Sequence, residues 1–467
     1  MNEIRIGILG NVDSGKSTII SVLKEHSLDN GRGLARNKIL KHKHEQVSGR
    51  TSSITHHYYD NEEKNKILSF IDLAGHEKYY KTTIFGVNGC SLDYIVLMIG
   101  SNMGVTKMTI EHLTLILIMK IPFIIVFSKI DICPPNIYKQ TFNTLVKMLK
   151  KYKIYHELKQ ITDLESAKLN WNFQDSKIIP YFNVSNVKGN NINILRDFLL
   201  NIKNIYNWKE LSTQKQKCLV EDIFFVKGVG IVITGTVISG IISKGDKIMI
   251  GPFNGIFYEI QIKSIHNNFR KYVDCIEAGK SGCFNIKSLD KHFYIKRSSI
   301  KRGMILLDKT HDNHTYREFE AKIKILHHPT TIKENYETTI HCGSIRQIAT
   351  IIKIKNKNKE DINNDNREVN TDNREVNTNN REVNTNNREV NTDNREVNTN
   401  NREVNTNNRE VNTDNRNDNE EICYLRTGDT STVVFRFKKK PEFIQENKQI
   451  IFREGQTKGI GWITKII

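Results

Sequence analysis

The stretch GNVDSGKST, Gly10 to Thr18, constrains the fold of this chain more than any other feature of its sequence. It matches the pattern G-x-x-x-x-G-K-[ST] and follows an apolar run, EIRIGIL, that is typical of a buried strand. In such a strand, loop and helix unit, glycines let backbone N–H groups converge on phosphate oxygens at a helix N-terminus. The sequence therefore predicts a phosphate-binding loop formed by Gly10, Asn11, Val12, Asp13, Ser14, Gly15, Lys16, Ser17 and Thr18.

Apolar runs alternate with helical patterns in the first part of the chain. The runs are EIRIGIL, ILSFID, YIVLMIG, FIIVFSK and IIPYFNV. This alternation is typical of a mostly parallel sheet with flanking helices. Further on, β-branched runs separated by glycine, such as GIVITGTVISGIISKGDKIMI, indicate antiparallel barrels. We therefore expect an α/β P-loop domain at residues 1–207, followed by two all-β barrel domains at 208–312 and 313–467.

A seven-residue repeat, N-R-E-V-N-T-(D/N), occupies residues 366–414. Each copy carries a single apolar residue, a valine, whereas a coiled-coil seam needs two positions in every seven. Asn and Thr are too polar to offset the entropy lost on ordering. We expect a disordered insertion at about 355–420 in a hairpin of the last barrel.

The formal net charge of +18 comes from the part of the chain outside the repeat. The repeat holds seven Arg, seven Glu and three Asp, a net charge of −3, so the remainder carries +21. A basic surface favours a polyanionic partner such as RNA, because Lys and Arg neutralise phosphates. The excess of Lys, Asn and Ile is equally typical of a skewed codon supply, which needs no partner.

The sequence gives no support for secretion, membrane insertion or a zinc site. The N-terminus lacks a basic head and a small-residue cleavage site. The most apolar region, 113–127, is interrupted by Lys120 and Pro122, and it is shorter than the roughly 20 residues that span a bilayer. The seven cysteines are scattered without a C-x-x-C pair. We expect a cytoplasmic, monomeric protein with no membrane partner.

Three further segments complete a predicted nucleotide site. Asp72 ends the run ILSFID and Gly75 follows it, which suits a metal carboxylate and a γ-phosphate contact. In FSKID, Ser128, Lys129 and Asp131 follow the next strand, and Asp131 can accept two hydrogen bonds from guanine. Ser185 and Asn186 complete the base pocket. With Lys16 on the β and γ phosphates and Ser17 on Mg²⁺, these segments predict a site for GTP and GDP.

The order GNVDSGKST, DLAGH, SKID and VSN, followed by two barrels, resembles the translational GTPases related to elongation factor Tu. Within that superfamily, LDNGRGLARNKILKHKHEQVSGRTSSI, LHHPTTI, HCGSIRQIATI and FREGQTKGIGWITKI resemble the GTP-binding protein 1 and 2 branch. The resemblance covers nearly the whole chain except the repeat and a variable patch around 155–178.

The resemblance implies roles for individual residues. Thr51 would be the switch I threonine that ligates Mg²⁺ together with Ser17 and Asp72, and Ser52 and Ser53 are neighbouring alternatives. His76 would position the attacking water, and Lys16 would neutralise charge on the phosphates. The switch loops would be 33–53 and 74–89. No arginine finger is identifiable from the motifs, so turnover is expected to be slow until the ribosome stimulates it.

Three residues depart from the elongation factor Tu pattern. Ser128 stands in place of an asparagine, and its hydroxyl is expected to tie the loop to the base. Arg50 stands where that protein has an apolar gate residue paired with the position of Val12. Cys283, in AGKSGCFNI, replaces an acidic residue in the segment that shapes the aminoacyl-end pocket.

Two functions remain open at this level. The first is a Mg²⁺-dependent GTPase that acts on the ribosome in tRNA delivery or in translation quality control and rescue. The second is a GTP-gated regulator that binds RNA or protein in mRNA processing or decay without delivering tRNA. The basic surface and the two barrels favour the first function, and Cys283 favours the second.

Overall fold

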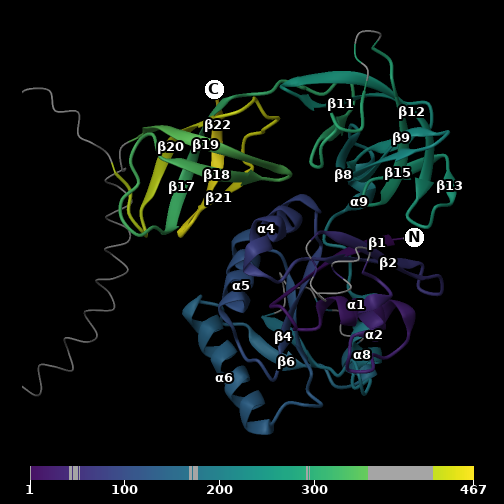
Figure 1. Cartoon of the computed structure of the whole chain (residues 1–467), viewed down its shortest axis with the longest axis vertical. Coiled ribbons are helices and arrows are strands. Elements are labelled where there is room, and N and C mark those ends of the chain that lie inside the picture. Colours follow the sequence, from purple (N-terminus) through teal and green to yellow (C-terminus); the bar gives the residue numbers. More distant parts are fainter. Residues whose placement is uncertain are drawn as a thin grey trace, which may run out of the picture.

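Three β-sheet bodies make up the computed structural model of this chain (Figure 1). The structure describes residues 2–40, 45, 51, 53–167, 171, 177–290, 293, 295–355 and 424–467. Over these residues, no helix combines the length and the apolar character needed to cross a membrane. The first body contains strands β1 to β7, and we call it the α/β domain; barrel II contains β8 to β16, and barrel III contains β17 to β22.

The α/β domain has a central sheet whose described strands lie in the order β2-β3-β1-β4-β5-β7-β6. Every pairing is parallel except that of β2 with β3. The strands are β1 (Asn2–Gly10), β2 (Thr55–Asn61), β3 (Lys66–Asp72), β4 (Tyr94–Gly100), β5 (Phe123–Ser128), β6 (Glu157–Gln160) and β7 (Ile178–Asn183). Strands β4 and β5 are buried along their whole length, which explains their continuous apolar sequences.

Helices cover both faces of this sheet. One face packs against α1 (Lys16–Glu25) and α8 (Ile192–Asn201), and the other against α4 (Tyr80–Gly89), α5 (Lys107–Met119) and α6 (Pro135–Lys151). The shorter helices are α2 (Leu34–Asn37), η1 (Glu77–Tyr79), α7 (Leu164–Ala167) and α9 (Trp208–Ser212). The P-loop joins β1 to α1, at the carboxyl edge of the parallel strands, where ligands bind in open α/β sheets.

Barrel II is an antiparallel sheet in the order β11-β16-β8-β9-β15-β12-β13, and the pairing of β11 with β12 closes it. Its strands are β8 (Lys217–Val226), β9 (Gly230–Ser239), β11 (Lys247–Phe253), β12 (Ile256–Asn267), β13 (Tyr272–Val273), β15 (Ser281–Ser288) and β16 (Ile305–Leu307). A separate pair, β10 (Ile241–Ser243) with β14 (Cys275–Glu277), lies beside it.

Barrel III is closed in the order β17-β20-β19-β18-β21-β22. Its strands are β17 (Glu318–His327), β18 (Glu337–Cys342), β19 (Ile345–Ile354), β20 (Thr430–Phe437), β21 (Gln449–Glu454) and β22 (Thr457–Ile466). The repeat lies outside the described residues, but β19 and β20 on either side of it pair directly, through Ile354 and Val433 among others. The predicted disordered insertion at about 355–420 stays a prediction, and the pairing of the strands on either side of it agrees with the expected hairpin position.

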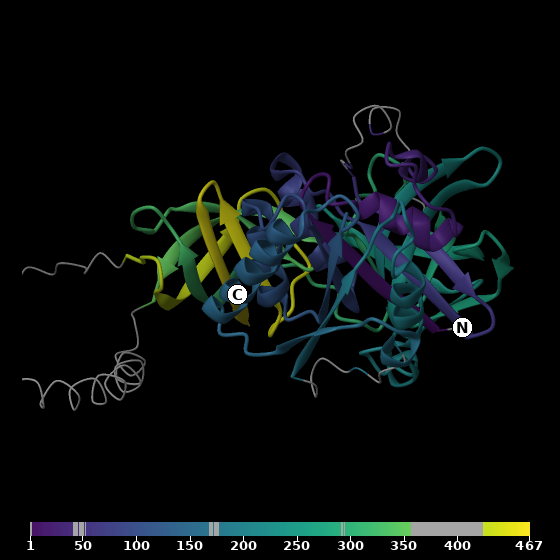
Figure 2. The ribbon, with the colours of Figure 1, turned by 90° about the horizontal axis from the view of Figure 1, so that it is seen from below.

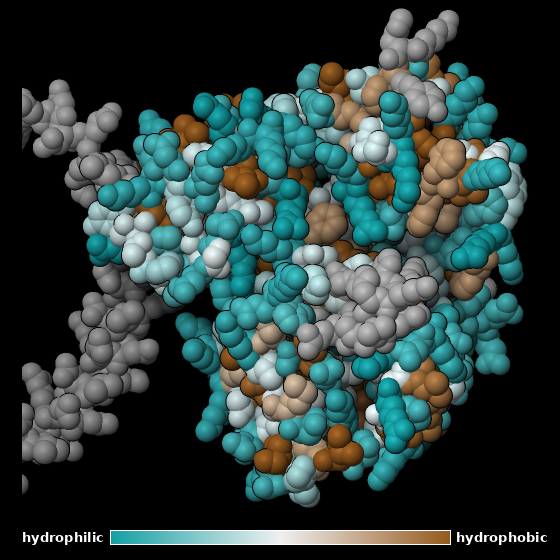
Figure 3. Space-filling model, in the orientation of Figure 1, coloured by the Kyte–Doolittle hydropathy of each residue, from teal (hydrophilic) through white to brown (hydrophobic). Residues whose placement is uncertain are grey.

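Both barrels contact the α/β domain (Figures 1 and 2). On the barrel II side, the Glu3 carboxylate accepts from the backbone N–H of Ser281 at 3.1 Å and from its hydroxyl at 3.0 Å. On the barrel III side, Glu111 of α5 accepts from Arg453 at 3.0 Å. The face in Figure 3 is mostly hydrophilic, with apolar residues in small groups rather than in one broad patch.

The predicted fold class, an α/β domain followed by two β barrels, is confirmed. The domain limits at 1–207, 208–312 and 313–467 stay predictions. Two edge strands were not among the predicted runs: β2, THHYYDN, and β6, ELKQ. Both are polar and only partly buried, so they lack the apolar signal on which the prediction depended.

Candidate nucleotide site

A small cavity lies over the P-loop, between the start of α1 and the segment that follows β3. It measures about 40 Å³, whereas pockets for drug-sized ligands measure roughly 300–1,000 Å³. In this closed form the cavity therefore suits a phosphate group rather than a whole nucleotide. It is lined by Val12, Asp13, Gly15, Lys16, Ser17, Thr18, Arg36, Thr51, Gly75 and His76.

The other predicted P-loop residues hold the loop together. The Ser14 hydroxyl donates to the Asn11 carbonyl at 2.8 Å, and the Lys16 ammonium donates to the same oxygen at 2.9 Å. Burial lowers the pKa of Lys16, and the nearby Asp72 and Asp13 oppose this effect. Gly10 ends β1 and leads into the loop.

Gly75 packs tightly against the P-loop. A Cβ atom at Gly75 would lie 2.5 Å from the Gly10 carbonyl oxygen and would also collide with the Lys16 ammonium. No larger residue fits there without moving the loop. The predicted Gly75 therefore brings the backbone after β3 next to the lysine that is expected to hold the phosphates.

Three side-chain oxygens converge at the base of the cavity. The Ser17 hydroxyl donates to Asp72 Oδ2 at 2.5 Å, and Thr51 Oγ1 lies 3.0 Å from Ser17 Oγ and 3.1 Å from Asp72 Oδ2. Asp72 Oδ1 is buried with no hydrogen-bond partner among the described residues. Burial raises the pKa of Asp72, against the opposing effects of Lys16, Ser17 and Thr51. A hard-oxygen set with one unused carboxylate oxygen fits Mg²⁺.

Thr51 and its neighbours differ in their contacts. Thr51 belongs to this oxygen cluster, whereas the Ser53 hydroxyl donates to Glu45 at 3.3 Å. Ser52 and Arg50 lie outside the described residues. Of the two hydroxyls that the structure describes, only that of Thr51 is next to Ser17.

His76 borders the cavity and caps η1. Its Nδ1 accepts a hydrogen bond from the backbone N–H of Lys78 at 3.1 Å. Because that nitrogen is an acceptor, the neutral ring carries its proton on Nε2. The ring can therefore donate a hydrogen bond from Nε2, which suits orienting a water molecule.

The predicted base-binding residues lie at the ends of β5 and β7. The buried Ser128 hydroxyl donates to the Ser14 carbonyl at 2.7 Å. This hydroxyl ties the P-loop to the end of β5, and its expected link to the base stays a prediction. Lys129, with φ +60°, and Asp131 follow directly and are only partly buried.

The segment after β7 completes this side of the site. The Ser185 hydroxyl oxygen accepts from the backbone N–H groups of Val187 at 3.3 Å and of Lys188 at 3.0 Å. The Asn186 amide nitrogen lies 3.4 Å from the position of a Cβ at Gly15, and its Oδ1 is buried with no hydrogen-bond partner among the described residues. Ser185 thus shapes the loop, and Asn186 adjoins the P-loop.

Arg36 is the cavity residue that the sequence did not identify. It belongs to α2, inside the predicted switch I segment. Arg32 and Lys38 lie within four residues of it, so no sequence pattern separates the side chain that faces the cavity from those that do not.

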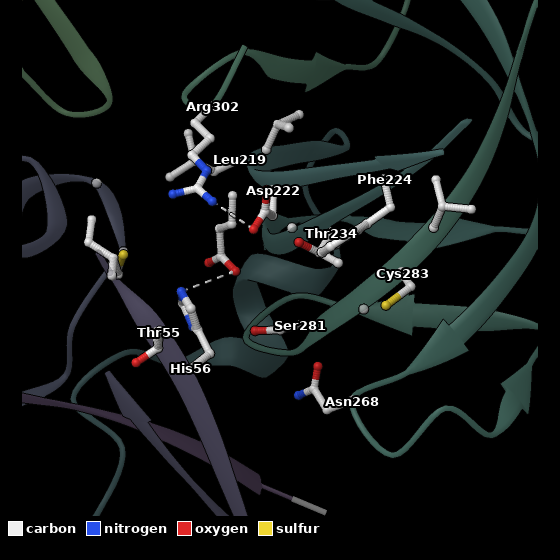
Figure 4. Close-up of a pocket in the computed structure, with 18 of the residues that line it drawn as sticks. Thr55, His56, Leu219, Asp222, Phe224, Thr234, Asn268, Ser281, Cys283 and Arg302 are labelled. Carbon is white, nitrogen blue, oxygen red and sulfur yellow. Dashed lines mark hydrogen bonds and ion pairs between the residues drawn. The ribbon is translucent and has the colours of Figure 1, made fainter. Parts of the chain in front are cut away.

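A second, larger cavity of about 520 Å³ separates the α/β domain from barrel II (Figure 4). The His56 side chain of β2 points toward the barrel residues Leu219, Asp222, Thr234 and Cys283, while its neighbour Thr55, also in the cavity wall, points away from them. His56 Nε2 lies 3.9 Å from Glu221, and Arg302 pairs with Asp222 at 2.8 Å. Burial raises the pKa of Cys283, Arg270 opposes this effect and Glu221 adds to it, so the thiol stays protonated near neutral pH.

The two cavities share the ladder between β2 and β3. Thr55, in the wall of the larger cavity, is the register partner of Asp72, which binds Ser17 and Thr51. Thr51 itself lies four residues before Thr55 in the chain. The metal-site cluster and the wall of the larger cavity therefore meet at one pair of strands, β2 and β3.

Comparisons with known proteins agree with this arrangement. Residues 1–205 match the family described as elongation factor Tu GTP binding domain. The chain is 35% identical to GTP-binding protein 1 of Xenopus laevis, over 100% of this chain and 64% of that protein. It is 32% identical to GTP-binding protein 2 of Homo sapiens, over 99% of this chain and 69% of that protein.

More distant relatives share the fold. The selenocysteine-specific elongation factor of Methanocaldococcus jannaschii is 26% identical over 76% of this chain and 67% of that protein. The solved structure of translation elongation factor SelB from Methanococcus maripaludis, in complex with the GTP analogue GppNHp, superposes with a TM-score of 0.64 at 18% identity. That match covers 100% of this chain and 80% of the other. The chain belongs to the GTP-binding protein 1 and 2 family, within the elongation factor Tu-like translational GTPases.

Proposed function

We propose that this chain is a GTP-hydrolysing switch that acts on the ribosome, in tRNA delivery or in translation quality control and rescue. The observation that carries the proposal is the ladder between β2 and β3, which joins the phosphate cavity to the larger cavity beside barrel II. A GTPase that only hydrolysed nucleotide would not need such a connection. We place the activity in the cytoplasm and expect a monomer.

The reaction is attack of water on the γ phosphorus of GTP, which yields GDP and phosphate. In this proposal the Lys16 ammonium moves from the Asn11 carbonyl to the phosphate oxygens and neutralises their charge. His76 donates from Nε2 to the attacking water and orients it for in-line attack. Lys129 and Asp131 hold the guanine base, with Ser185 and Asn186 beside them.

Ser17, Thr51 and Asp72 would hold Mg²⁺. When bound, this ion would neutralise charge on the β and γ phosphates. The three oxygens already contact one another, and one carboxylate oxygen of Asp72 has no other partner among the described residues. Since Thr51 is in the predicted switch I, loss of the γ phosphate would free this segment and the start of β2.

The larger cavity is the proposed site for the acceptor end of a tRNA. It is walled by strands of two domains, and it combines exposed aromatic side chains, Phe224 and Phe225, with the basic residues Arg270 and Arg302. Aromatic faces stack on bases, and arginines bind phosphates. The net charge of +21 outside the repeat supports a nucleic-acid partner.

The test is GTP turnover by the purified chain with and without ribosomes. Stimulation by ribosomes supports the proposal, and its absence contradicts it. Filter binding of charged and uncharged tRNA, at several salt concentrations and with either GppNHp or GDP, then tests the larger cavity. We expect His56→Ala to weaken tRNA binding while GTP binding stays unchanged; the exposed His314→Ala serves as the matched control.

A second function is supported by Cys283. A protonated thiol in the wall of the larger cavity, where elongation factor Tu has an acidic residue, favours a GTP-gated RNA or protein binder that does not deliver tRNA. This alternative predicts nucleotide-dependent binding of RNA or protein with no preference for charged tRNA. Strong selectivity for charged tRNA in the same filter assay excludes it.

A further inference from the structure

The one-turn helix α2 brings an arginine to the phosphate cavity. Arg36 lines the cavity together with Lys16, Thr51 and His76, which come from the P-loop helix, the predicted switch I and the segment after β3. The sequence motifs identify Lys16, Thr51 and His76 as site residues, but no motif includes Arg36. Arg36 therefore lines the same cavity as the histidine expected to orient water.

The helix that carries Arg36 is held firmly against α1. The Asp29 carboxylate accepts three backbone N–H groups, from Gly31 at 3.0 Å, Gly33 at 3.2 Å and Ala35 at 2.8 Å. The Ser21 hydroxyl of α1 donates to the Ala35 carbonyl at 2.6 Å, and Ala35 is buried. The backbone next to Arg36 is therefore positioned before any ligand binds, which lowers the entropic cost of using the side chain.

The guanidinium occupies space that Gly33 leaves open. Gly33 has φ +89°, and a Cβ atom there would lie 2.5 Å from Arg36 Nε and 2.8 Å from Cζ. A side chain at this position would push the guanidinium away from its present place. Glycine is required here for two reasons: the backbone is left-handed, and the Arg36 side chain packs directly against it.

The guanidinium has no anionic partner among the residues that the structure describes. Its Nε is buried without a hydrogen-bond partner, and no ion pair joins Arg36 to a carboxylate of the described residues. Asp13 and Lys16 are the other charged side chains that line the cavity. Arg36 is only partly buried, but its buried Nε lacks a partner among the described residues, and a buried polar atom without a partner is costly. An anionic ligand in the cavity would satisfy it.

We propose that Arg36 is a catalytic arginine supplied by the chain itself, which contacts the γ phosphate and stabilises the charge that develops on it during hydrolysis. This inference rests on the proposed GTPase function. Arginines that act on the same phosphoryl group in other GTPases raise kcat by about 10³–10⁵-fold, whether a partner or the same chain supplies them. The expectation of a slow enzyme without an arginine finger would then no longer hold.

The test is single-turnover hydrolysis of GTP by the full chain without ribosomes, for wild type, Arg36→Ala and Arg36→Lys. We expect Arg36→Ala to lower the rate constant by about 10³-fold while GDP affinity changes less than about threefold. We expect Arg36→Lys to be faster than Arg36→Ala but slower than wild type, because lysine keeps the positive charge but lacks the planar guanidinium group that binds two phosphate oxygens at once. The exposed neighbour Arg32→Ala is the control and keeps the wild-type rate.

A second measurement uses the transition-state mimic formed by GDP and aluminium fluoride. Wild type binds this complex more tightly than GDP, and Arg36→Ala loses that advantage while still binding GDP, which also proves that the variant is folded. If wild type hydrolyses GTP and Arg36→Ala does so at a rate within twofold, the inference is wrong. Weaker GTP binding at an unchanged single-turnover rate also overturns it. If wild type does not hydrolyse GTP at all, the proposed function falls as well.

Discussion

A single hydrogen bond fixes the chemistry open to His76. Because its Nδ1 accepts from the Lys78 backbone, the neutral ring carries its proton on Nε2 and cannot take a proton from water at that nitrogen. The ring can hold and orient a water molecule but is not set up as a general base. Positioning without proton abstraction suits phosphoryl transfer, in which orientation and charge stabilisation dominate.

For this reason we expect His76→Ala to reduce ribosome-stimulated hydrolysis by about 10²-fold or more while GTP affinity stays the same. His76→Gln, whose amide can still donate a hydrogen bond, should retain more activity than His76→Ala. Multiple-turnover assays together with nucleotide binding separate the two quantities, and the exposed His314→Ala is the control. Equal rates for wild type and His76→Ala would show that the histidine has no part in hydrolysis.

The free energy of unfolding depends on pH through the titration of Asp93. Burial raises its pKa to about 6, although the Arg5 charge and the Arg5 backbone N–H, which donates at 2.7 Å, lower it. A folded pKa above the ordinary 3.8 means that the folded state binds the proton more tightly. This contribution to the free energy of unfolding is therefore full below about pH 4 and is lost as the pH rises to about 6.

Asp93→Asn removes this titration. Between pH 4 and 6 we expect the variant to lose about 2–3 kcal/mol less stability than wild type. Thermal unfolding measured at intervals across that range checks the slope, and Asp197→Asn, which removes a surface carboxylate, is the control. Parallel curves for wild type and Asp93→Asn would rule out the titration of Asp93 in this window.

At the residue level, the sequence identified those parts of the site whose residues lie close together in the sequence. The P-loop and the segment from Asp72 to His76 each lie on one loop after one strand, so spacing alone defines them. Arg36 could not be identified, because only the contact of α2 with α1 decides which basic side chain of the loop faces inward. The partner of the Ser128 hydroxyl, the Ser14 carbonyl, likewise depends on the packing of two distant loops.

At the level of elements, α5 holds barrel III against the α/β domain. Glu111 of α5 accepts from Arg453 at 3.0 Å and also from Lys458. Burial raises the pKa of Glu111, but its bonds and proximity to Lys458 and Arg453 outweigh this effect and leave it below the ordinary value. The Arg453 guanidinium also lies 4.4 Å from the centre of the Tyr80 ring in α4. Helix α4, which lies within the predicted switch II segment, is thus tied to barrel III along with α5.

We expect Glu111→Ala to loosen this contact by about 1–3 kcal/mol, below the value for a fully buried pair because Arg453 and Lys458 are partly exposed. Hydrogen exchange in β21 and β22 should become faster. The matched control is Glu77→Ala, which breaks the exposed pair with Lys107, worth roughly 0–1 kcal/mol. Equal exchange in β21 and β22 for the two variants would contradict the role of Glu111.

The strands that are most buried were the easiest to predict from the sequence. Strands β4 and β5 are buried throughout and were evident as apolar runs, whereas β2 and β6 carry polar residues at the edges of the sheet. Edge strands owe their place to pairing with a neighbour rather than to their own hydrophobic pattern. Strand β2, which lines the larger cavity, therefore had no sequence signal of its own.

At the scale of the whole molecule, the repeat interrupts barrel III only between two paired neighbours. Since β19 and β20 pair with each other, we expect the length of the chain between them to affect stability weakly. Deletion of residues 366–414 should change the free energy of unfolding by roughly 1 kcal/mol or less. Thermal unfolding and GTP binding of the shortened chain measure this effect. An unfolded product would show that the repeat is required for folding.

The register of β2 limits how this molecule can change over evolution or in the laboratory. Side chains of a strand alternate between its two faces, so inserting one residue before His56 would turn that histidine away from barrel II and bring its neighbour into its place. The same insertion would move Thr55 out of step with Asp72. The spacing between the two cavities thus depends on the length of this strand as well as on its side chains.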